Sequence, residues 1–449
     1  MSFAKYPAYK DSGVAWLGRV PGHWEVKRLR HVAALNPSKS EIAEFPRDTE
    51  VSFLPMEAVG DDGTLNLDRT RPIAEVESGY TYFREGDVTI AKITPCFEND
   101  KGAVMRGLHN GHGFGTTELI VARPSEWHND ERLPAPSFHF AVVPTCWVRL
   151  PCTGLADKSA SPMISSVTLP VAFPPLSEQT AIATFLDHET AKIDALVAEQ
   201  EKLIALLQEK RQAVISHAVT KGLNPHAPMK DSGVEWLGEV PGHWEVRRIR
   251  DLSSFLTSGP RGWSERISEE GAKFIQSGDL TDELSIAFDE AKRVAVNDDA
   301  EAARTKLADG DVVVCITGAK TGNVALCGVV PEDAYVNQHL CLIRPRPDIL
   351  PDLLAIYLKS DAGQRHFAVA QYGLKQGMSL ENIKETPVLV PPIHEQRQIV
   401  EIARSTSVSI GALITEARTA ITLLQERRTA LVSAAVTGQI DVRGWAKAA

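Results

Sequence analysis

The strongest constraint on the fold is a long run of sequence that occurs twice. The first copy opens at Pro174 with Pro-Pro-Leu-Ser-Glu-Gln, and the second opens at Pro391 with Pro-Pro-Ile-His-Glu-Gln. The copies lie 217 positions apart and stay in register to the Ala-Val-Thr motifs at 218–220 and 435–437. After its opening prolines, the first copy contains no Pro or Gly before Gly222. A duplication of this length predicts two related halves.

Each run predicts a long helix, because its apolar residues recur at helical spacing. Proline suits a helix entry, and Gly222 favours the end of the first helix. About 40 residues at ~1.5 Å each give a rod of roughly 60 Å. Two apolar stripes in one chain favour an antiparallel pair over a stalk that binds another protein. The stripes are Ile193, Leu196, Val197, Leu203, Ile204, Leu207, Val214, Ile215 and Ala218, and then Ile410, Leu413, Ile414, Ile421, Leu424, Leu431, Val432 and Ala435.

A second repeat is shorter and more closely kept. Residues 10–30 return as residues 230–250, with four of the 21 positions changed. Gly and Pro interrupt the segment and tryptophans anchor it, so we expect a docking surface rather than a strand or a helix. We interpret its histidines, His23 and His243, as structural. Glu178 and Glu395 stand at the helix entries, where we expect them to cap the helices.

The order of the chain is segment, variable block, helix, and then the same again. The variable blocks, 31–169 and 251–386, have similar lengths and divergent sequences. A duplicated frame with diverged inserts suggests one scaffold that presents two recognition surfaces. The predicted fold class is α/β (α+β), with two mixed α/β recognition domains separated by two long antiparallel coiled-coil helices in a pseudo-two-fold, circular arrangement. The predicted boundaries are 1–172 (first domain), 173–222 (central helix), 223–389 (second domain) and 390–449 (C-terminal helix).

Gly-rich loops follow predicted strands in both blocks. The strands are expected at 51–56, 87–91, 119–122 and 310–316. Gly lets a backbone approach phosphate, Lys neutralises phosphate, and Asn, Gln and Thr can read base edges. The same residues are common in ordinary hairpin turns. The candidate DNA contacts are Lys92, Thr94, Asn99, Lys101, Thr116, Thr117 and Lys158 in the first block, and Arg261, Thr317, Lys320, Thr321, Asn337, Gln338, Lys375 and Gln376 in the second.

The bulk composition limits the class of protein. A net charge of −10 argues against a nucleic-acid binder, although a local basic groove would suffice for binding. We therefore expect a more basic partner to supply part of any attraction to DNA. The six cysteines form no Cys-x-x-Cys pair, and no signal peptide or membrane span is recognisable. These features predict a cytoplasmic protein with no membrane association.

Motifs of the common catalytic and cofactor sites are missing from the sequence. There is no Gly-x-Gly-x-x-Gly fingerprint, no Walker A sequence and no His-Glu-x-x-His. Asn36-Pro37 is followed by Ser38-Lys39, so it is not the Asn-Pro-Pro-Tyr/Phe motif of adenine methylases. We predict a non-enzyme, with no cofactor and no metal of its own.

The repeated motifs, taken together, resemble the specificity subunit of type I restriction-modification systems. The matching pieces cover almost the whole chain: the two Trp-Leu-Gly…Pro-Gly-His-Trp-Glu-Val segments, Phe-Leu-Pro-Met-Glu at 53–57, Ile-Thr-Pro-Cys-Phe at 93–97, Gly-Phe-Gly-Thr-Thr-Glu at 113–118, and the two Pro-Pro-x-x-Glu-Gln helices. One departure is that the exit of the first block, around Lys158, lacks the Gln present at Gln376.

The resemblance implies a division of labour within a complex. Each block would be a target-recognition domain for one half of a bipartite site in double-stranded DNA. The paired helices would act as a ruler and dock two methyltransferase subunits, which methylate adenine N6 with S-adenosylmethionine. A motor-nuclease subunit, which uses ATP and Mg, would join through them. The alternatives are a scaffold that joins two protein partners without reading DNA, and, less well supported, a stand-alone methylase or nuclease.

Overall fold

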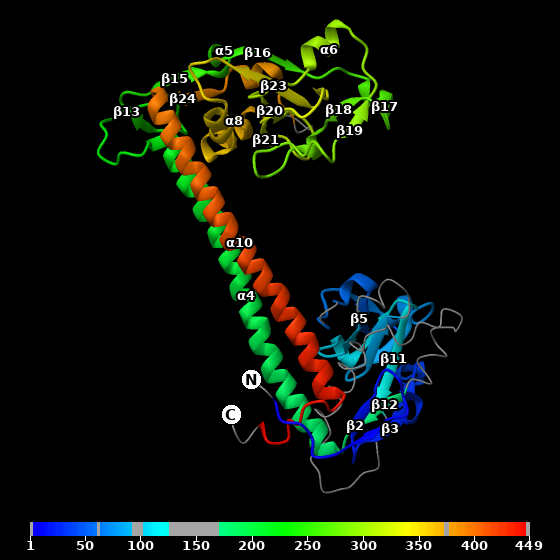
Figure 1. Ribbon diagram of the computed structural model, residues 1–449. Coiled ribbons are helices and arrows are strands. Elements are labelled where there is room, and N and C mark those ends of the chain that lie inside the picture. Colours follow the sequence, from blue (N-terminus) through cyan, green and yellow to red (C-terminus); the bar gives the residue numbers. More distant parts are fainter. Residues whose placement is uncertain (1–2, 61–62, 92–101, 125–169, 372–376, 446–449) are drawn as a thin grey trace. The chain divides into compact units, whose positions relative to one another are not determined.

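The computed structural model describes residues 3–60, 63–91, 102–124, 170–371 and 377–445. The chain forms two compact units, Met1–Glu199 with Ala420–Ala449, and Gln200–Thr419. Two long helices, α4 (Leu176–Lys221) and α10 (Ile393–Val436), each contribute residues to both units (Figure 1). Both helices begin as predicted, directly after the second proline of the motif, and α4 ends at the residue before Gly222. The predicted C-terminal helix was too long, because α10 ends at Val436 and not at residue 449.

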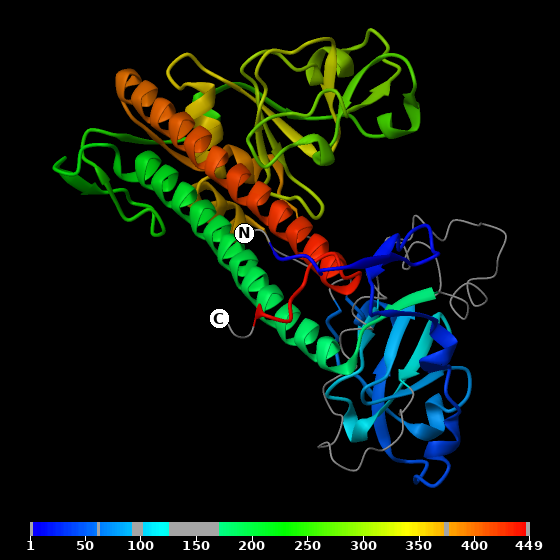
Figure 2. The same cartoon turned by 60° about the horizontal axis from the view of Figure 1, so that its bottom comes forward.

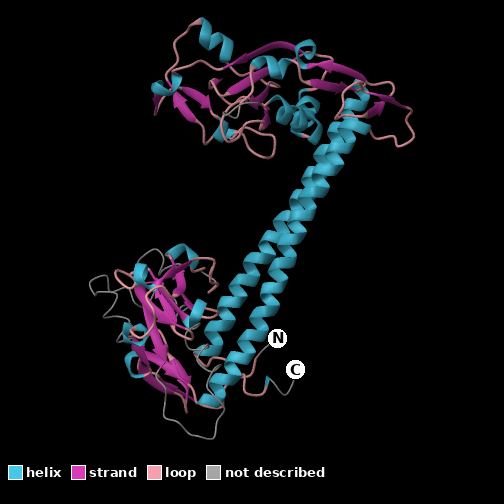
Figure 3. Ribbon diagram, turned by 180° about the vertical axis from the view of Figure 1, so that it is seen from behind, coloured by secondary structure: helices cyan, strands magenta, loops and turns pink. Residues whose placement is uncertain are grey.

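The first unit contains short strands in small sheets (Figure 3). A hairpin, β1-β2, precedes the two-stranded pair β3-β12, and two four-stranded sheets have the orders β6-β5-β10-β7 and β4-β11-β8-β9. The bounds are β1 Tyr9–Asp11, β2 Arg19–Pro21, β3 Glu25–Arg28, β4 Ala33–Leu35, β5 Glu50–Leu54, β6 Thr70–Pro72, β7 Thr81–Arg84, β8 Val88–Ala91, β9 Gly102–Val104, β10 His112–Gly115, β11 Leu119–Pro124 and β12 Pro170–Phe173, with helix α1 at Ile73–Val76.

The second unit repeats this plan, and its described residues also include several short helices. Its sheets are β13-β14, β15-β24, β16-β23-β20-β21 and β17-β19-β18-β22. The strands are β13 Met229–Asp231, β14 Glu239–Pro241, β15 Glu245–Arg248, β16 Ser253–Ser258, β17 Ile267–Ser268, β18 Ala272–Ile275, β19 Lys292–Val294, β20 Val312–Cys315, β21 Val324–Leu326, β22 Ala334–Val336, β23 Leu340–Pro345 and β24 Pro387–Val390; the helices are α5 Ile249–Leu252, α6 Ala300–Thr305, α7 Pro351–Lys359, α8 Asp361–Ala370 and α9 Leu380–Lys384.

The divergent blocks therefore share one sheet topology. The sheet β4-β11-β8-β9 corresponds strand for strand to β16-β23-β20-β21, and the parallel pair β5-β10 corresponds to β18-β22. The strands expected in the blocks are confirmed in β5, β8, β11 and β20. The two blocks thus share one backbone scaffold, as expected, although their sequences show little similarity.

The repeated segments form β-strands, which contradicts the sequence-based expectation that they would not. Each forms a hairpin, and its second half pairs with the strand that closes the variable block: β3 pairs with β12, and β15 with β24. Trp24 and Trp244 are fully buried. The expectation was wrong because the segment is not an isolated, Gly-interrupted loop. One strand of each segment, β3 or β15, pairs with a strand more than a hundred positions away, which local sequence does not reveal.

A carboxylate at each helix entry holds the segment in place. Trp24 Nε1 donates to Glu178 Oε2 at 2.8 Å, and His23 Nε2 lies 2.6 Å from Oε1. The second frame repeats this arrangement around Glu395, at 2.9 Å from the Trp244 indole and 2.7 Å from the His243 imidazole. These glutamates thus bind the repeated segments through their side chains, which corrects the expected helix-capping role and confirms the structural histidines.

The surroundings of Glu395 shift its pKa in opposite directions. Burial raises the pKa of this carboxyl, while the hydrogen bonds from Trp244 and His243 and the charges of His243 and His394 together bring it below its ordinary value. In the first unit, Glu178 has additional partners from both ends of the chain: the Tyr6 hydroxyl donates to it at 3.2 Å, and Arg443 lies 3.7 Å away.

The end of each long helix packs on the repeated segment of the unit that contains it. In the second unit, Gly222 follows α4 with φ +76, and a Cβ there would lie 3.1 Å from the Trp244 ring. In the first unit, Gly438 follows α10 with φ +72, and a Cβ would lie 2.3 Å from Pro21. Both the left-handed φ and the close approach require glycine. The end of α10 thus meets the first segment as the end of α4 meets the second, which is the predicted circular relation.

The two long helices lie side by side in each unit (Figures 1 and 2). In the first unit, Phe185 and Ile193 of α4 pack with Leu431 and Val432 of α10 in one cluster. In the second, Ala218 and Val219 of α4 share a core with Ile399, Val400 and Ala403 of α10. Because the beginning of α4 meets the end of α10, and the reverse holds in the other unit, the helices are antiparallel as predicted.

We predict that Glu395→Ala lowers the free energy of unfolding by about 1–3 kcal/mol, because the buried Trp244 indole loses its acceptor. Urea unfolding followed by tryptophan fluorescence measures the change. Glu401→Ala removes an exposed carboxylate from the same helix and should stay within about 0.5 kcal/mol of wild type. Equal effects of the two substitutions would show that the bond to the segment does not hold the fold.

Candidate nucleic-acid interface

Four of the predicted DNA contacts lie in two turns, one in each unit, which occupy equivalent positions in the sheet topology. Thr116-Thr117 lies between β10 and β11, and Asn337-Gln338 lies between β22 and β23. The turns have the same hydrogen bond: Leu119 N donates to Thr116 O at 3.2 Å, and Leu340 N to Asn337 O at 3.1 Å. Each turn follows a strand of the parallel pair, so the two blocks present different polar residues from the same backbone position.

The side chains within these turns differ in exposure. Asn337 is buried, and its Oδ1 accepts from His339 N at 3.0 Å, so its amide shapes the turn. Gln338 is partly exposed, and Thr117 is exposed. The buried Thr116 Oγ1 has no hydrogen-bond partner in the described part of the chain. Gln338 and Thr117 are thus accessible to a ligand, whereas Asn337 is buried and its oxygen accepts from the turn.

A loop after β20 places more candidates beside the second turn. Thr317 Oγ1 lies 2.5 Å from His339 Nδ1, and His339 Nε2 lies 3.2 Å from Gln338 Nε2. Gly377 pairs with Thr317 through a backbone bridge. Thr317, His339 and Gln338 therefore form a row of polar side chains. His339 was not among the predicted DNA contacts; the signal that could have placed it here was its position directly after Asn-Gln.

The other candidates of this loop contact their own surroundings. Lys320 Nζ donates to Gly278 O at 3.3 Å, and Thr321 Oγ1 donates to Gly318 O at 2.6 Å. Arg261 is exposed in the loop after β16, and in the described ranges no contact joins it to the row. The remaining candidates lie outside the described residues and stay predictions: Lys92, Thr94, Asn99, Lys101, Lys158, Lys375 and Gln376.

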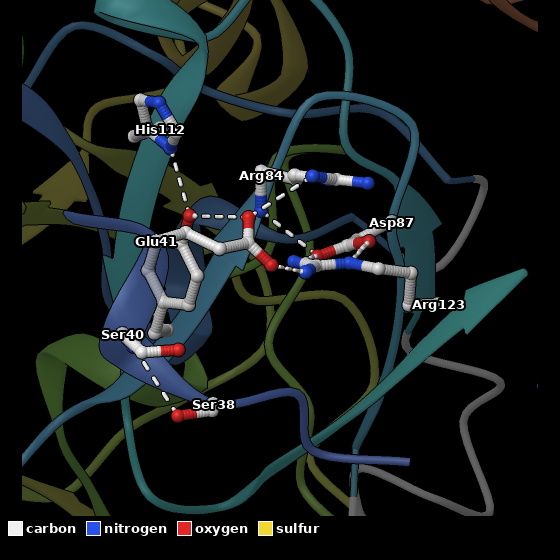
Figure 4. A network of polar contacts seen from close by, with 8 residues as sticks. Ser38, Ser40, Glu41, Arg84, Asp87, His112 and Arg123 are labelled. Carbon is white, nitrogen blue, oxygen red and sulfur yellow. Dashed lines mark hydrogen bonds and ion pairs between the residues drawn. The ribbon is translucent and has the colours of Figure 1, made fainter. Parts of the chain in front are cut away.

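A polar network braces the sheets of the first unit (Figure 4). Arg123 forms two hydrogen bonds of 2.7 Å with Asp87, and it also contacts Glu41. The Tyr82 hydroxyl lies 2.8 Å from His112 Nδ1. Burial raises the pKa of Tyr82 to about 12, with the Glu41 charge acting in the same direction, and burial lowers the pKa of His112.

The core of this network is a scaffold feature, because the second unit repeats it. Arg344 makes the same paired bonds of 2.8 Å to Asp311, between the equivalent strands β23 and β20. Such bidentate pairs are strong and geometrically specific. At the neighbouring position, the Tyr82–His112 contact is replaced by an ion pair of 2.6 Å between Lys306 and Asp333.

A cavity adjoins this network on the side of the first turn. It has a volume of 340 Å³, and Lys39, Tyr80, Tyr82 and Thr117 are among its lining residues. Lys39 Nζ donates to the carbonyls of Glu77 at 2.7 Å and Tyr80 at 2.8 Å. The predicted contact Thr117 therefore borders a hollow with aromatic and cationic walls.

The comparison with known proteins agrees with this geometry. Residues 241–408 match the family model described as the type I restriction modification DNA specificity domain. The type I restriction enzyme EcoAI specificity subunit of Escherichia coli is 37% identical over 194 residues, which cover 42% of this chain and 31% of that protein. Over these matched residues the chain is similar to the type I restriction-modification specificity subunits. The EcoEI specificity subunit of the same species is 23% identical over 474 residues, covering 85% of this chain and 77% of that protein.

Solved structures show the same fold. A chain from a structure on complex assembly and conformational transition of the type I R-M system has a TM-score of 0.68 at 16% identity, covering 93% of this chain and 98% of that one. The HsdS subunit from Thermoanaerobacter tengcongensis has a TM-score of 0.50 at 17% identity, covering 94% and 98%. The predicted mixed fold is confirmed, and the relatives described above are named as specificity subunits, the family that the sequence motifs resemble.

Proposed function

We propose that this chain is the DNA-recognition subunit of a type I restriction-modification complex, and that each variable block reads one half of a bipartite DNA site. The observation that carries the proposal is the pair of equivalent turns. One backbone position presents Thr116-Thr117-Glu118 in the first unit and Asn337-Gln338-His339 in the second. A shared scaffold with different polar residues at one place is what two different half-sites require.

The chemistry of these residues suits base edges. Gln can bond adenine at N6 and N7, Thr can bond several bases, and Glu accepts from cytosine N4. The row of Thr317, His339 and Gln338 offers several such groups from two adjacent loops. We propose that Lys320, Thr321 and Arg261 contact phosphate or base edges near this row. The candidates outside the described residues belong to the same proposal.

We predict that Gln338→Ala changes one position of the recognised DNA motif and leaves the unfolding midpoint unchanged, because Gln338 is partly exposed. Asn337→Ala is the matched comparison: loss of its turn bond should lower stability by about 1 kcal/mol. Sequencing of N6-methyladenine in DNA from cells that express the chain with its methylase gives the motif. An unchanged motif with Gln338→Ala would contradict base reading at this turn.

The long helices carry exposed leucines at equivalent positions. Leu196 and Leu413 are equivalent in the repeat and are 51% and 47% exposed; Leu206 and Leu423 are 53% and 59% exposed. The first unit contains Leu196 and Leu423, and the second contains Leu206 and Leu413. Exposed apolar groups at repeated places suit a partner that binds once per unit. We propose that two methyltransferase subunits dock on the paired helices and that these helices act as the ruler between half-sites.

The composition of α10 supports protein docking. By length and composition alone, this helix could cross a membrane, and 17% of its most apolar window is buried in the structure. An apolar helix surface that the described residues leave largely uncovered is suited to a protein partner. We propose a cytoplasmic protein without a membrane partner.

We predict that the pair Leu196→Asp and Leu423→Asp removes one bound methyltransferase, that Leu206→Asp and Leu413→Asp removes the other, and that all four together remove both. Light scattering of the purified complex measures the number of copies. Gln208→Asp and Gln425→Asp introduce the same charge at exposed, equivalent positions and should leave two copies bound. Two copies on the fourfold leucine variant would contradict docking at these leucines.

The remaining parts of the proposal concern chemistry supplied by partners. S-adenosylmethionine would belong to the methyltransferase subunits, and ATP and Mg to a motor-nuclease subunit that joins through them, so the chain itself would need no cofactor.

The second candidate function is a scaffold that binds two proteins without reading DNA. The assembled complex should shift duplex DNA in a salt-dependent way under the first proposal and should not do so under the second.

A further inference from the structure

Three cationic side chains from three elements of the second unit gather beside the candidate base contacts. Lys359 is the last residue of α7, Lys320 lies in the loop after β20, and Arg211 lies on α4. This part of α4 is fixed against the start of α8: Gln212 Nε2 donates to Asp361 Oδ1 at 3.0 Å, and Asp361 N donates to Ser216 Oγ at 3.2 Å.

Lys359 is held in place by a neutral group. Its Nζ donates to Asn323 Oδ1 at 2.6 Å, and the Asn323 amide in turn donates to Leu280 O at 3.0 Å. Its carboxylate partner among the described residues is Asp282, whose Oδ1 lies 3.8 Å away on a side chain that is 96% exposed. The Lys359 ammonium is therefore held in position by the Asn323 amide, and the exposed Asp282 carboxylate neutralises its charge only weakly.

The surroundings disfavour this positive charge. Burial lowers the pKa of Lys359, Asp282 opposes that shift, and the charges of Arg211 and Lys320 lower the pKa further. A partly desolvated ammonium beside two other cations is costly unless an anion compensates it. Asp279 is a carboxylate influenced by the charge of Lys320; burial raises its pKa, and its Oδ2 already accepts from Gln276 N at 2.7 Å.

The same loop joins this cluster to the row of polar side chains. Thr317 at the start of the loop contacts His339, and Asn323 at the end of the loop holds Lys359. Gly318 and Gly322 of the loop adopt φ of +93 and +90, which lets the backbone turn closely between the two ends. A ligand that reaches both ends must offer hydrogen-bonding edges at one and negative charge at the other, and duplex DNA does so with its bases and phosphates.

We propose that Lys359, supported by Lys320 and Arg211, forms a site for a DNA backbone phosphate, which fixes the register of the duplex against the row Thr317–His339–Gln338. This inference rests on the proposed function and adds residues that the sequence did not suggest, Lys359 and Arg211. It also assigns α4 a direct role beside DNA, in addition to its role in the helix pair.

The test is duplex binding by the complete methyltransferase complex across a salt series, with the methylated motif in one duplex and a scrambled duplex as a second probe. Lys359→Gln should weaken binding to both duplexes by roughly five- to tenfold near 0.1 M salt and reduce the slope of log affinity against log salt by about 0.9. Lys359→Arg should retain the wild-type slope because it keeps the charge. Arg211→Gln, which lies on α4, should also reduce the slope of log affinity against log salt.

Lys384→Gln is the matched control, since Lys384 lies on α9 and pairs with Glu381 at 3.4 Å. It should bind both duplexes like wild type. Wild-type slopes for both Lys359→Gln and Arg211→Gln would overturn the phosphate site while leaving DNA recognition intact. If the wild-type complex binds neither duplex in a salt-dependent way, the proposed function fails, and the phosphate site fails with it.

Discussion

The fold depends on a carboxylate at the entry of each long helix, bonded to a buried indole and a neighbouring imidazole. Glu178 and Glu395 fix the repeated segment to the helix that follows its block. The segment also pairs with the strand that closes the block. Both ends of each variable block are therefore fixed at one place, which we call the clamp: the repeated segment at its start pairs with the strand at its end, and both adjoin the entry of the long helix.

This clamp explains how the blocks can diverge while keeping one architecture. Their sheets follow the same strand order, and each contains a bidentate Asp–Arg pair between equivalent strands. The side chains around that pair differ between the units: the Tyr82–His112 contact of the first unit is replaced by the Lys306–Asp333 ion pair in the second. The constant interactions set the backbone, and the exposed turns remain available for different ligands.

The long helices could be predicted because helical periodicity and the proline and glycine boundaries are local signals. The strands of the repeated segments could not, since each has only three or four residues, and β3 and β15 pair with strands more than a hundred positions away. The role of Glu178 was missed for the same reason: a glutamate at a helix entry looks like a cap until Trp24 is placed beside it. Asn337 looked like a base reader, but burial shows that its oxygen serves the turn.

The central claim is that the frame holds two recognition blocks that act independently. The most direct measurement exchanges residues 251–386 for the corresponding block of a related specificity subunit and maps N6-methyladenine in cells that express the hybrid with the methylase. The account predicts that one half of the methylated motif changes and that the other half and the spacing remain. A change in both halves would contradict it, because the clamps would then fail to isolate one block from the other.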